Sequence, residues 1–272
     1  MPKHNNFFKK IKKQFLSAND SIESLFNQLN NFILNFKKTR FDKNSKVILA
    51  FGVTLILILS YFLMPTVYDK KILEQKIKNQ ILKKYQIDID FNKKINYSLL
   101  PRPHFSSRNA TISRNENIIA DIESLKIFIA IDKFLFPKAV EVKDVILDKT
   151  EFNIKRTDFN FFQNLLNIEP SKNEIIIRNS KMFYKNENDE VLFINKIKNT
   201  KFYYDSNNLE NVLTSKNEIF NVPYKLLIKN DRFNKKIFSN FKSNKIRLNI
   251  ENEIDYQDKI LKGLLEILFV NK

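Results

Sequence analysis

The sequence predicts an α+β fold that is mainly antiparallel β, with a single transmembrane helix near the N-terminus. Residues 47–64 form an apolar run without charge, and residues 68–85 have the period of a short amphipathic helix. From residue 87 onward, apolar and polar residues alternate with the period of strands. We therefore divide the chain into an arm (1–46), a transmembrane helix (47–64) and a β domain (65–272).

Composition excludes several classes of site. The chain has no cysteine, so disulfides, zinc–thiolate sites, iron–sulfur clusters and thiol nucleophiles are ruled out. Its formal charge is +17: residues 1–46 carry ten Lys/Arg against three Asp/Glu, while residues 65–272 carry 37 against 27. The excess in the β domain is spread thinly, and it accompanies a general bias toward Asn, Ile, Lys and Phe. We therefore expect no nucleic-acid partner from charge alone.

The arm is basic and amphipathic. Lysines gather between Lys9 and Lys13, and apolar residues then recur three or four apart as far as Phe36. This pattern favours a helix on the membrane surface. A short coiled coil is the alternative, although aromatic residues are poor at its seam.

The run from Val47 to Met64 predicts an uncleaved transmembrane anchor. Its 18 residues cover roughly 27 Å as a helix, close to a hydrocarbon core of about 30 Å. Forty-six residues precede the run and no Ala-x-Ala-like site follows it, which argues against a signal peptide. The twenty residues before the run hold five Lys/Arg and the twenty after it hold six, so the local positive charge does not decide the orientation. The arm is short and its charges count fully, whereas a long domain crosses the membrane regardless of its charge. We expect the arm inside and the β domain outside.

A short helix and then strands follow the anchor. Residues 68–85 carry apolar residues on one face and lysines on the other, with Asp69 in the N-cap position. Ile87–Phe91 and Ile95–Leu99 alternate on either side of Asn92-Lys93-Lys94, which predicts a hairpin.

The same alternation predicts seven more strands, separated by polar turns. They are Leu125–Ile131, Val140–Leu147, Phe152–Arg156, Ile175–Tyr184, Val191–Tyr204, Tyr224–Ile228 and Lys245–Ile250. Polar turns are expected at 185–190, 205–211 and 230–236, and one short helix at Phe159–Leu166. No helix long enough for a parallel crossover is expected between strands, so the predicted sheet is antiparallel.

No sequence motif predicts catalysis, a cofactor or a metal. Two glycines cannot build a phosphate-binding loop, and His104 is the only histidine of the β domain, in a Pro-rich segment with no recognisable catalytic partner. Asp88 and Asp90 share one face of a strand and are interpreted as solvated. Lys201–Tyr204 interleaves lysine with aromatics and could stack bases, but the ordinary interpretation is a strand with one buried face.

The order of these features resembles the AsmA-like family of Gram-negative envelope proteins. The resemblance covers roughly residues 65–260. It rests on the anchor, the helix-and-strand run VYDKKILEQKIKNQILKKYQIDIDF, the aromatic-and-proline strand KKINYSLLPRPHF, and the later runs ADIESLKIFIAIDKFLFPKAV, VEVKDVILDKTEFNIK and EIIIRNSKMFYKNENDEVLFINKI. Lys or Asn stands where the family has glycines, the arm is longer, and the chain is shorter than typical members.

The resemblance implies a curved antiparallel sheet forming a lipid-lined groove. It also implies a single-pass protein of the bacterial inner membrane, with a cytoplasmic N-terminus and a periplasmic β domain. The implied role is phospholipid transfer between inner and outer membrane and outer-membrane assembly, without enzymatic activity. The alternative is a scaffold that binds outer-membrane proteins or assembly factors, affects protein targeting to the membrane and carries no lipid. An enzyme using His104 is a third, weaker hypothesis.

One strand supplies the lipid-contact prediction. Leu125, Ile127, Ile129 and Ile131 share a face of the strand predicted at 125–131, and we expect them to contact acyl chains. The alternative is that the helix at Ile72–Leu82 covers this face. The apolar tail KILKGLLEILFVNK is expected either to dock on a partner or to mark a chain that continues further.

Overall fold

The computed structural model describes residues 43–114, 117–135, 140–158, 164–169, 173–256 and 262–269. Almost all of the predicted arm, and most of the helix predicted at Phe159–Leu166, lie outside these residues; of the latter, 164–166 are helical. The helical elements are α2 (Lys43–Leu63), η1 (Met64–Val67), α3 (Lys70–Tyr85), η2 (Ile131–Lys133) and η4 (Arg156–Asp158). The strands are β1 (Asp88–Phe91), β2 (Asn96–Ser98), β3 (His104–Arg114), β4 (Asn117–Ile129), β5 (Val142–Lys155), β6 (Ile175–Lys185), β7 (Val191–Asp205), β8 (Glu210–Ile219), β9 (Val222–Asp231), β10 (Lys236–Ser243), β11 (Leu248–Asp255) and β12 (Lys262–Phe269).

The helix expected at 47–64 is present. Within the described residues, the stretch Lys46–Val67 is helical, long enough and apolar enough to cross a membrane, and none of its most apolar 18-residue window is buried. α2 begins at Lys43, four residues before the predicted start. The apolar composition thus produces the helix that the sequence predicts.

α3 is also confirmed, including its cap. The Asp69 carboxylate accepts hydrogen bonds from the backbone N–H groups of Lys71 (2.9 Å) and Ile72 (3.1 Å), which satisfies two of the free donors of the first turn. The helix ends at Tyr85, and its C-cap residue Gln86 has a left-handed φ of 56°.

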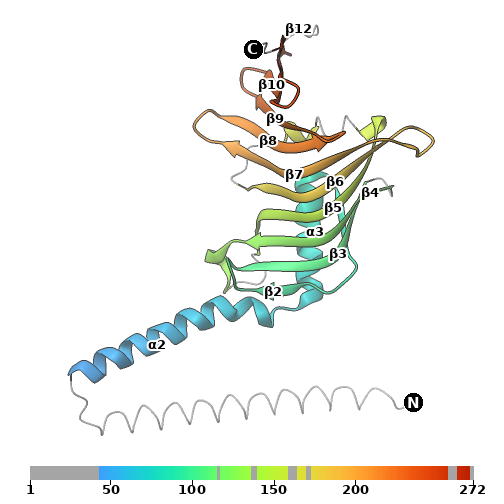
Figure 1. Ribbon diagram of the computed structural model, residues 1–272. Coiled ribbons are helices and arrows are strands. Elements are labelled where there is room, and N and C mark those ends of the chain that lie inside the picture. The colour runs from blue at the N-terminus through green and yellow to red at the C-terminus, as the bar shows by residue number, and fades with distance from the viewer. Residues whose placement is uncertain are drawn as a thin grey trace, which may run out of the picture. The chain divides into compact units, whose positions relative to one another are not determined.

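The strands form one open, mostly antiparallel sheet (Figure 1). Its order is β1, then β3 to β12 in sequence, with β2 also on β3. The prediction of a wholly antiparallel sheet is wrong at one pair, because β5 and β6 are parallel. Residues 156–174 make that crossover, and a connection of about a dozen residues suffices for one without a long helix.

The predicted hairpin of 87–91 and 95–99 is also wrong. β1 and β2 do not pair with each other; both pair antiparallel with β3, so they lie end to end along one edge of it. Between them, Ile95 is buried, and its N–H donates to Glu74 Oε1 of α3 (3.3 Å). Because Ile95 is buried against α3, the segment between β1 and β2 follows the helix and does not form a tight turn.

Other boundaries differ from the expectations in two ways. β3, β8, β10 and β12 were not expected as strands. The strands expected at 140–147 and 152–156 are parts of the continuous β5. The polar turns expected near 185–190, 205–211 and 230–236 are confirmed as the connections that follow β6, β7 and β9.

Left-handed residues at the same level of neighbouring strands explain the interrupted alternation. Asn109 of β3, Lys149 of β5 and Asn179 of β6 all have left-handed φ, between 48° and 56°. In the register, Asn109 and Lys149 fall on either side of Glu123 of β4, where none of the three is part of a paired position. The register is the same on both sides of this level, so the neighbouring strands change conformation together and none of them gains a residue over its partner. The left-handed residues also change which residues of a strand, odd-numbered or even-numbered, point to a given face. As a result, the same face of the sheet is apolar on both sides of this level.

The core lies between α3 and one face of the sheet, which we call the α3 face. One continuous cluster contains Leu73, Ile77 and Ile81 of α3 together with Leu125 and Ile127 of β4, each at most 4% exposed. Gln80 fastens α3 to the start of β5, because its amide donates to Val140 O (2.6 Å) and accepts from Val142 N (2.8 Å).

This core predicts a contrast within one strand. Ile122→Ala should lower the free energy of unfolding by about 2–5 kcal/mol, because Ile122 is 2% exposed and its removal leaves a cavity. Ile118→Ala, at a position 57% exposed in the same strand, should change it by less than about 0.5 kcal/mol. Urea unfolding of the detergent-solubilised protein measures both. Equal losses would contradict the assignment of the α3 face as the core.

Candidate functional site

The α3 face continues beyond α3 as the most distinctive surface of the sheet. Where α3 ends, a cavity of about 110 Å³ opens between the helix, the sheet and residues of the β5–β6 crossover. Its lining is aliphatic and aromatic: Ile81, Tyr85, Ile87, Ile89, Ile112, Ile119, Leu125, Val145, Leu147, Phe152, Leu165, Ile175 and Ile177. A cavity with this lining favours an apolar occupant over water.

The cavity is electrically neutral. Burial raises the pKa of the Tyr85 phenol to about 12, and the nearby Asp144 carboxylate adds to the shift. The phenol therefore stays uncharged at neutral pH and contributes its ring to the lining.

A row of apolar side chains, which we call the file, leads from this cavity across the remaining strands. Residues paired in the register point to the same side of a sheet, so the α3 face can be followed from strand to strand. Past Val145 and Leu147 the file consists of Ile175, Ile177, Phe202, Leu213, Leu226, Ile228, Phe241, Ile250 and Ile267. All are partly buried except Ile267, which is 50% exposed.

A ladder of buried polar residues flanks the file on one side. Thr200 Oγ1 and Ser215 Oγ are 2.5 Å apart, Ser215 Oγ donates to Asn217 Oδ1 (2.7 Å), and Tyr224 donates to Asn195 (3.1 Å). Burial raises the pKa of Tyr224. Because these polar groups form hydrogen bonds with one another, they need no water or ligand as a partner. Their burial beside an apolar surface therefore costs little free energy.

The crossover segment 164–169 flanks the other side. Asn211 Nδ2 donates to the carbonyls of Leu166 (3.0 Å) and Ile168 (2.9 Å). Asn230, which is fully buried, donates to Leu166 O (2.9 Å) and Asn167 Oδ1 (2.7 Å). Leu165 and Ile168 pack against the core cluster. The file thus runs between two walls, the ladder of polar residues and segment 164–169. Side-chain hydrogen bonds hold each wall in place.

The opposite face of the sheet is charged. Cross-strand ion pairs lie on it, including Lys196–Glu218 (2.9 Å), Lys201–Glu174 (2.8 Å), Lys229–Glu210 (3.5 Å) and Lys236–Glu253 (3.3 Å). Ion pairs at a protein surface contribute about 0–1 kcal/mol each, so they favour solubility more than stability. The two faces therefore differ in chemistry along much of the sheet.

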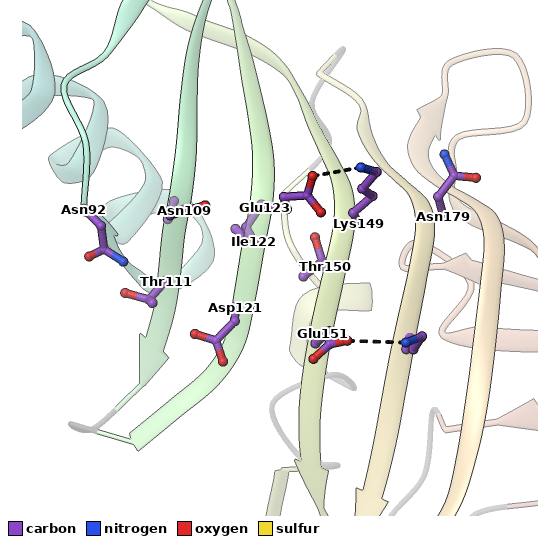
Figure 2. Close-up of a pocket in the computed structure, with 12 residues that line it drawn as sticks. Asn92, Asn109, Thr111, Asp121, Ile122, Glu123, Lys149, Thr150, Glu151 and Asn179 are labelled. Carbon is purple, nitrogen blue, oxygen red and sulfur yellow. Dashed lines mark hydrogen bonds and ion pairs between the residues drawn. The ribbon is translucent and has the colours of Figure 1, made fainter.

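A wide polar hollow on this charged side lies at the left-handed residues Asn109, Lys149 and Asn179 (Figure 2). Glu123 pairs with Lys149 (2.8 Å) and Glu151 with Lys181 (3.5 Å). In each pair, both side chains are more than half exposed. Among the described residues, no group of His, Asp and Glu is arranged to hold a metal ion. The hollow therefore offers surface ion pairs rather than a built site.

The predicted lipid-contact residues occupy two environments. Leu125, Ile127 and Ile129 are 0%, 1% and 4% exposed, enclosed in the core cluster with α3. Ile131 does not continue their strand, because it belongs to η2 and is 43% exposed. The alternative that the helix at Ile72–Leu82 covers this face agrees with the packing. The accessible part of the face is the file, which was not singled out from the sequence.

The remaining candidates have structural surroundings. His104 is 3% exposed, its Nδ1 lies 2.7 Å from Arg102 O, and its ring packs on Phe128 with centroids 5.2 Å apart. Asp88 and Asp90 lie on an exposed strand face, as expected, and Asp90 pairs with Lys78 (2.6 Å). In the stretch 201–204, Phe202 belongs to the file, and Lys201 pairs with Glu174 on the other face.

Neither family models nor curated proteins give a match to this chain. The AsmA-like resemblance therefore rests on the order of the features in the sequence.

The walls of the file yield a prediction. Asn230→Ala removes two hydrogen bonds to segment 164–169 and should destabilise the protein by about 1–3 kcal/mol. It should also speed proteolysis within that segment. Asn208→Ala is the matched control, since Asn208 lies in an exposed turn and bonds only to Asp205 (2.8 Å). Limited proteolysis with mass spectrometry compares the two, and equal cleavage would show that Asn230 does not hold the wall.

Proposed function

We propose that this protein is a membrane-anchored, non-enzymatic envelope protein whose sheet binds phospholipid acyl chains along a groove. The observation that carries the proposal is the apolar file, which leads out of an apolar cavity and has a charged face behind it. In an ordinary single-layer sheet, a second layer covers such a face. Here acyl chains would supply the cover, with an attraction of about 25 cal/mol per Å² of apolar area buried.

The resemblance to AsmA-like proteins gives this surface a context. In that context α2 crosses the bacterial inner membrane, the N-terminus is cytoplasmic and the sheet is periplasmic. The protein then takes part in phospholipid transfer between inner and outer membrane and in outer-membrane assembly. The partly buried file supports this assignment, because acyl chains need a long apolar surface rather than a closed pocket.

A scaffold for outer-membrane proteins or assembly factors is the second candidate, favoured by β12. Within the described residues β12 pairs only with β11, and it exposes Leu264, Leu265, Ile267, Leu268 and Phe269. An edge strand with free backbone groups and apolar side chains is a template for another strand. On this hypothesis the file binds protein and carries no lipid.

Photo-crosslinking separates the two functions. A photoreactive residue at Leu226 or Phe241, both in the file, should capture phospholipid in cells. The same residue at Leu227 or Asn240, the next position on the opposite face of the same strand, should not. Each pair shares strand and depth and differs only in face. Equal labelling of the two faces, or protein adducts alone at Leu226, would exclude the lipid groove, and protein adducts would favour the scaffold.

The anchor and its orientation have a separate test. Alkaline extraction should leave the protein in the membrane fraction. Because the chain has no cysteine, single-cysteine variants report sidedness directly. In spheroplasts, an impermeant maleimide should label Phe233→Cys, at a position 87% exposed, and should label Lys12→Cys only after lysis. The reverse labelling pattern would show the opposite orientation. Release of the protein into the supernatant would show that it has no membrane anchor.

A further inference from the structure

We propose that the end of the sheet next to α2 carries a second membrane contact, a base that rests in the interface of a phospholipid bilayer. The base consists of exposed apolar residues from three separate segments: Leu63, Met64, Val67, Leu100, Ile131 and Leu135. The inference adds a surface to the proposed function and shares only its premise that α2 enters a membrane.

Three hydrogen bonds tie the last turn of α2 and the segment after it to this end of the sheet. Tyr61 donates to Ile131 O (2.5 Å) and Tyr97 donates to Phe62 O (2.6 Å). Tyr68 donates to Phe134 O. Each bond joins residues 35 to 70 positions apart in the chain, so the end of α2, β2 and the segment 131–134 form one structural unit.

An aromatic cluster fixes the same junction. The Phe134 ring is 1% exposed and lies between Tyr61 (centroids 5.7 Å apart), Phe62 (6.2 Å) and Tyr97 (6.4 Å). Burial raises the pKa of Tyr97 to about 12, with Tyr68 adding to the shift. Tyrosines with an at least partly buried ring and a bonded hydroxyl are typical of the boundary between apolar and polar surroundings.

The register brings the two loops to one corner. His104, which begins β3, pairs with Phe128 near the end of β4, and Ser98 of β2 pairs with His104. The loop 99–103 and the η2 segment 131–135 therefore emerge at the same end of the sheet. Their tips are apolar: Leu100 is 77% exposed and Leu135 is 53% exposed.

A lipid surface is the occupant that this position favours. The exposed residues Leu63, Met64 and Val67 continue the apolar helix Lys46–Val67 without interruption, so the base adjoins the segment proposed to enter the bilayer. Lysine and arginine lie among the apolar tips, with Lys133 paired to Glu141 (2.5 Å) and Arg102 to Asp144 (3.2 Å). Because carboxylates neutralise both cations, the exposed apolar side chains rather than charge favour the hydrocarbon side of a membrane interface.

The chain has no tryptophan, so single-tryptophan variants of the full-length protein report depth without background. We would reconstitute Leu100→Trp and Leu135→Trp in phosphatidylcholine–phosphatidylglycerol vesicles and add brominated phosphatidylcholine as quencher. Both should lose emission to an extent comparable with Phe51→Trp, which lies in α2. Phe233→Trp and Phe220→Trp are the controls, since both positions are exposed (87% and 76%) at turns of distant strands.

The outcomes are distinct. Quenching at Leu100 and Leu135 with none at the two controls supports the base. Quenching at Phe51 alone overturns the base and leaves the anchor in place. Quenching at all positions indicates adsorption of the whole domain and also overturns it. An unquenched Phe51→Trp overturns both anchor and base, whereas lipid capture at Leu226 is a separate measurement.

Discussion

The structure depends on the need to cover one apolar face of an open, single-layer sheet. A sheet with one face in water stabilises the fold only if the other face is buried against another layer. α3 supplies that layer for the first strands, where Leu125 and Ile127 are almost completely enclosed. The core cluster that contains α3 stops at β6, where Ile175 and Ile177 are only partly buried. The proposed function follows from this mismatch between the extent of the face and the extent of its cover.

Register keeps the face apolar over so many strands. A slip of one residue would exchange the two faces, bringing Lys201 or Lys229 into the file. The left-handed residues Asn109, Lys149 and Asn179 act in the same sense, because at each of them the strand exchanges its two faces while the register to its neighbours stays unchanged. Asn and Lys adopt the left-handed conformations that glycine usually takes, in a chain with only two glycines.

The long apolar or strictly alternating segments could be predicted from the sequence. α2, α3 with its Asp69 cap, β6 and β7 are such segments, and their patterns depend only on neighbours along the chain. β8 could not be predicted in this way, because Asn211, Ser215 and Asn217 are buried polar residues on its inner face. They are compatible with burial only through partners on other strands or in segment 164–169, which local alternation cannot reveal.

The candidate site was missed for a related reason. The strand at 125–131 has the strongest aliphatic alternation, but that property is typical of a fully covered core as much as of a lipid-binding face. The residues of the file lie on separate strands with polar neighbours in sequence. They become a continuous surface only when the register aligns Phe202 with Leu213 and Ile228, and Leu226 with Phe241. The parallel pairing of β5 and β6 was missed because the crossover requires no long helix.

The energy of the α3 cover limits how lipid could reach the file. Burying a large aliphatic side chain contributes roughly 1.5–3 kcal/mol, so Leu73, Ile77 and Ile81 together contribute on the order of 6 kcal/mol. That is comparable with the stability of a whole domain, about 5–15 kcal/mol. A state with α3 lifted from the sheet would therefore be nearly as rare as the unfolded state. On the proposed function, lipid would therefore join the file beyond the end of α3, at the apolar cavity whose lining includes Ile81 of the helix and Leu165 of the crossover.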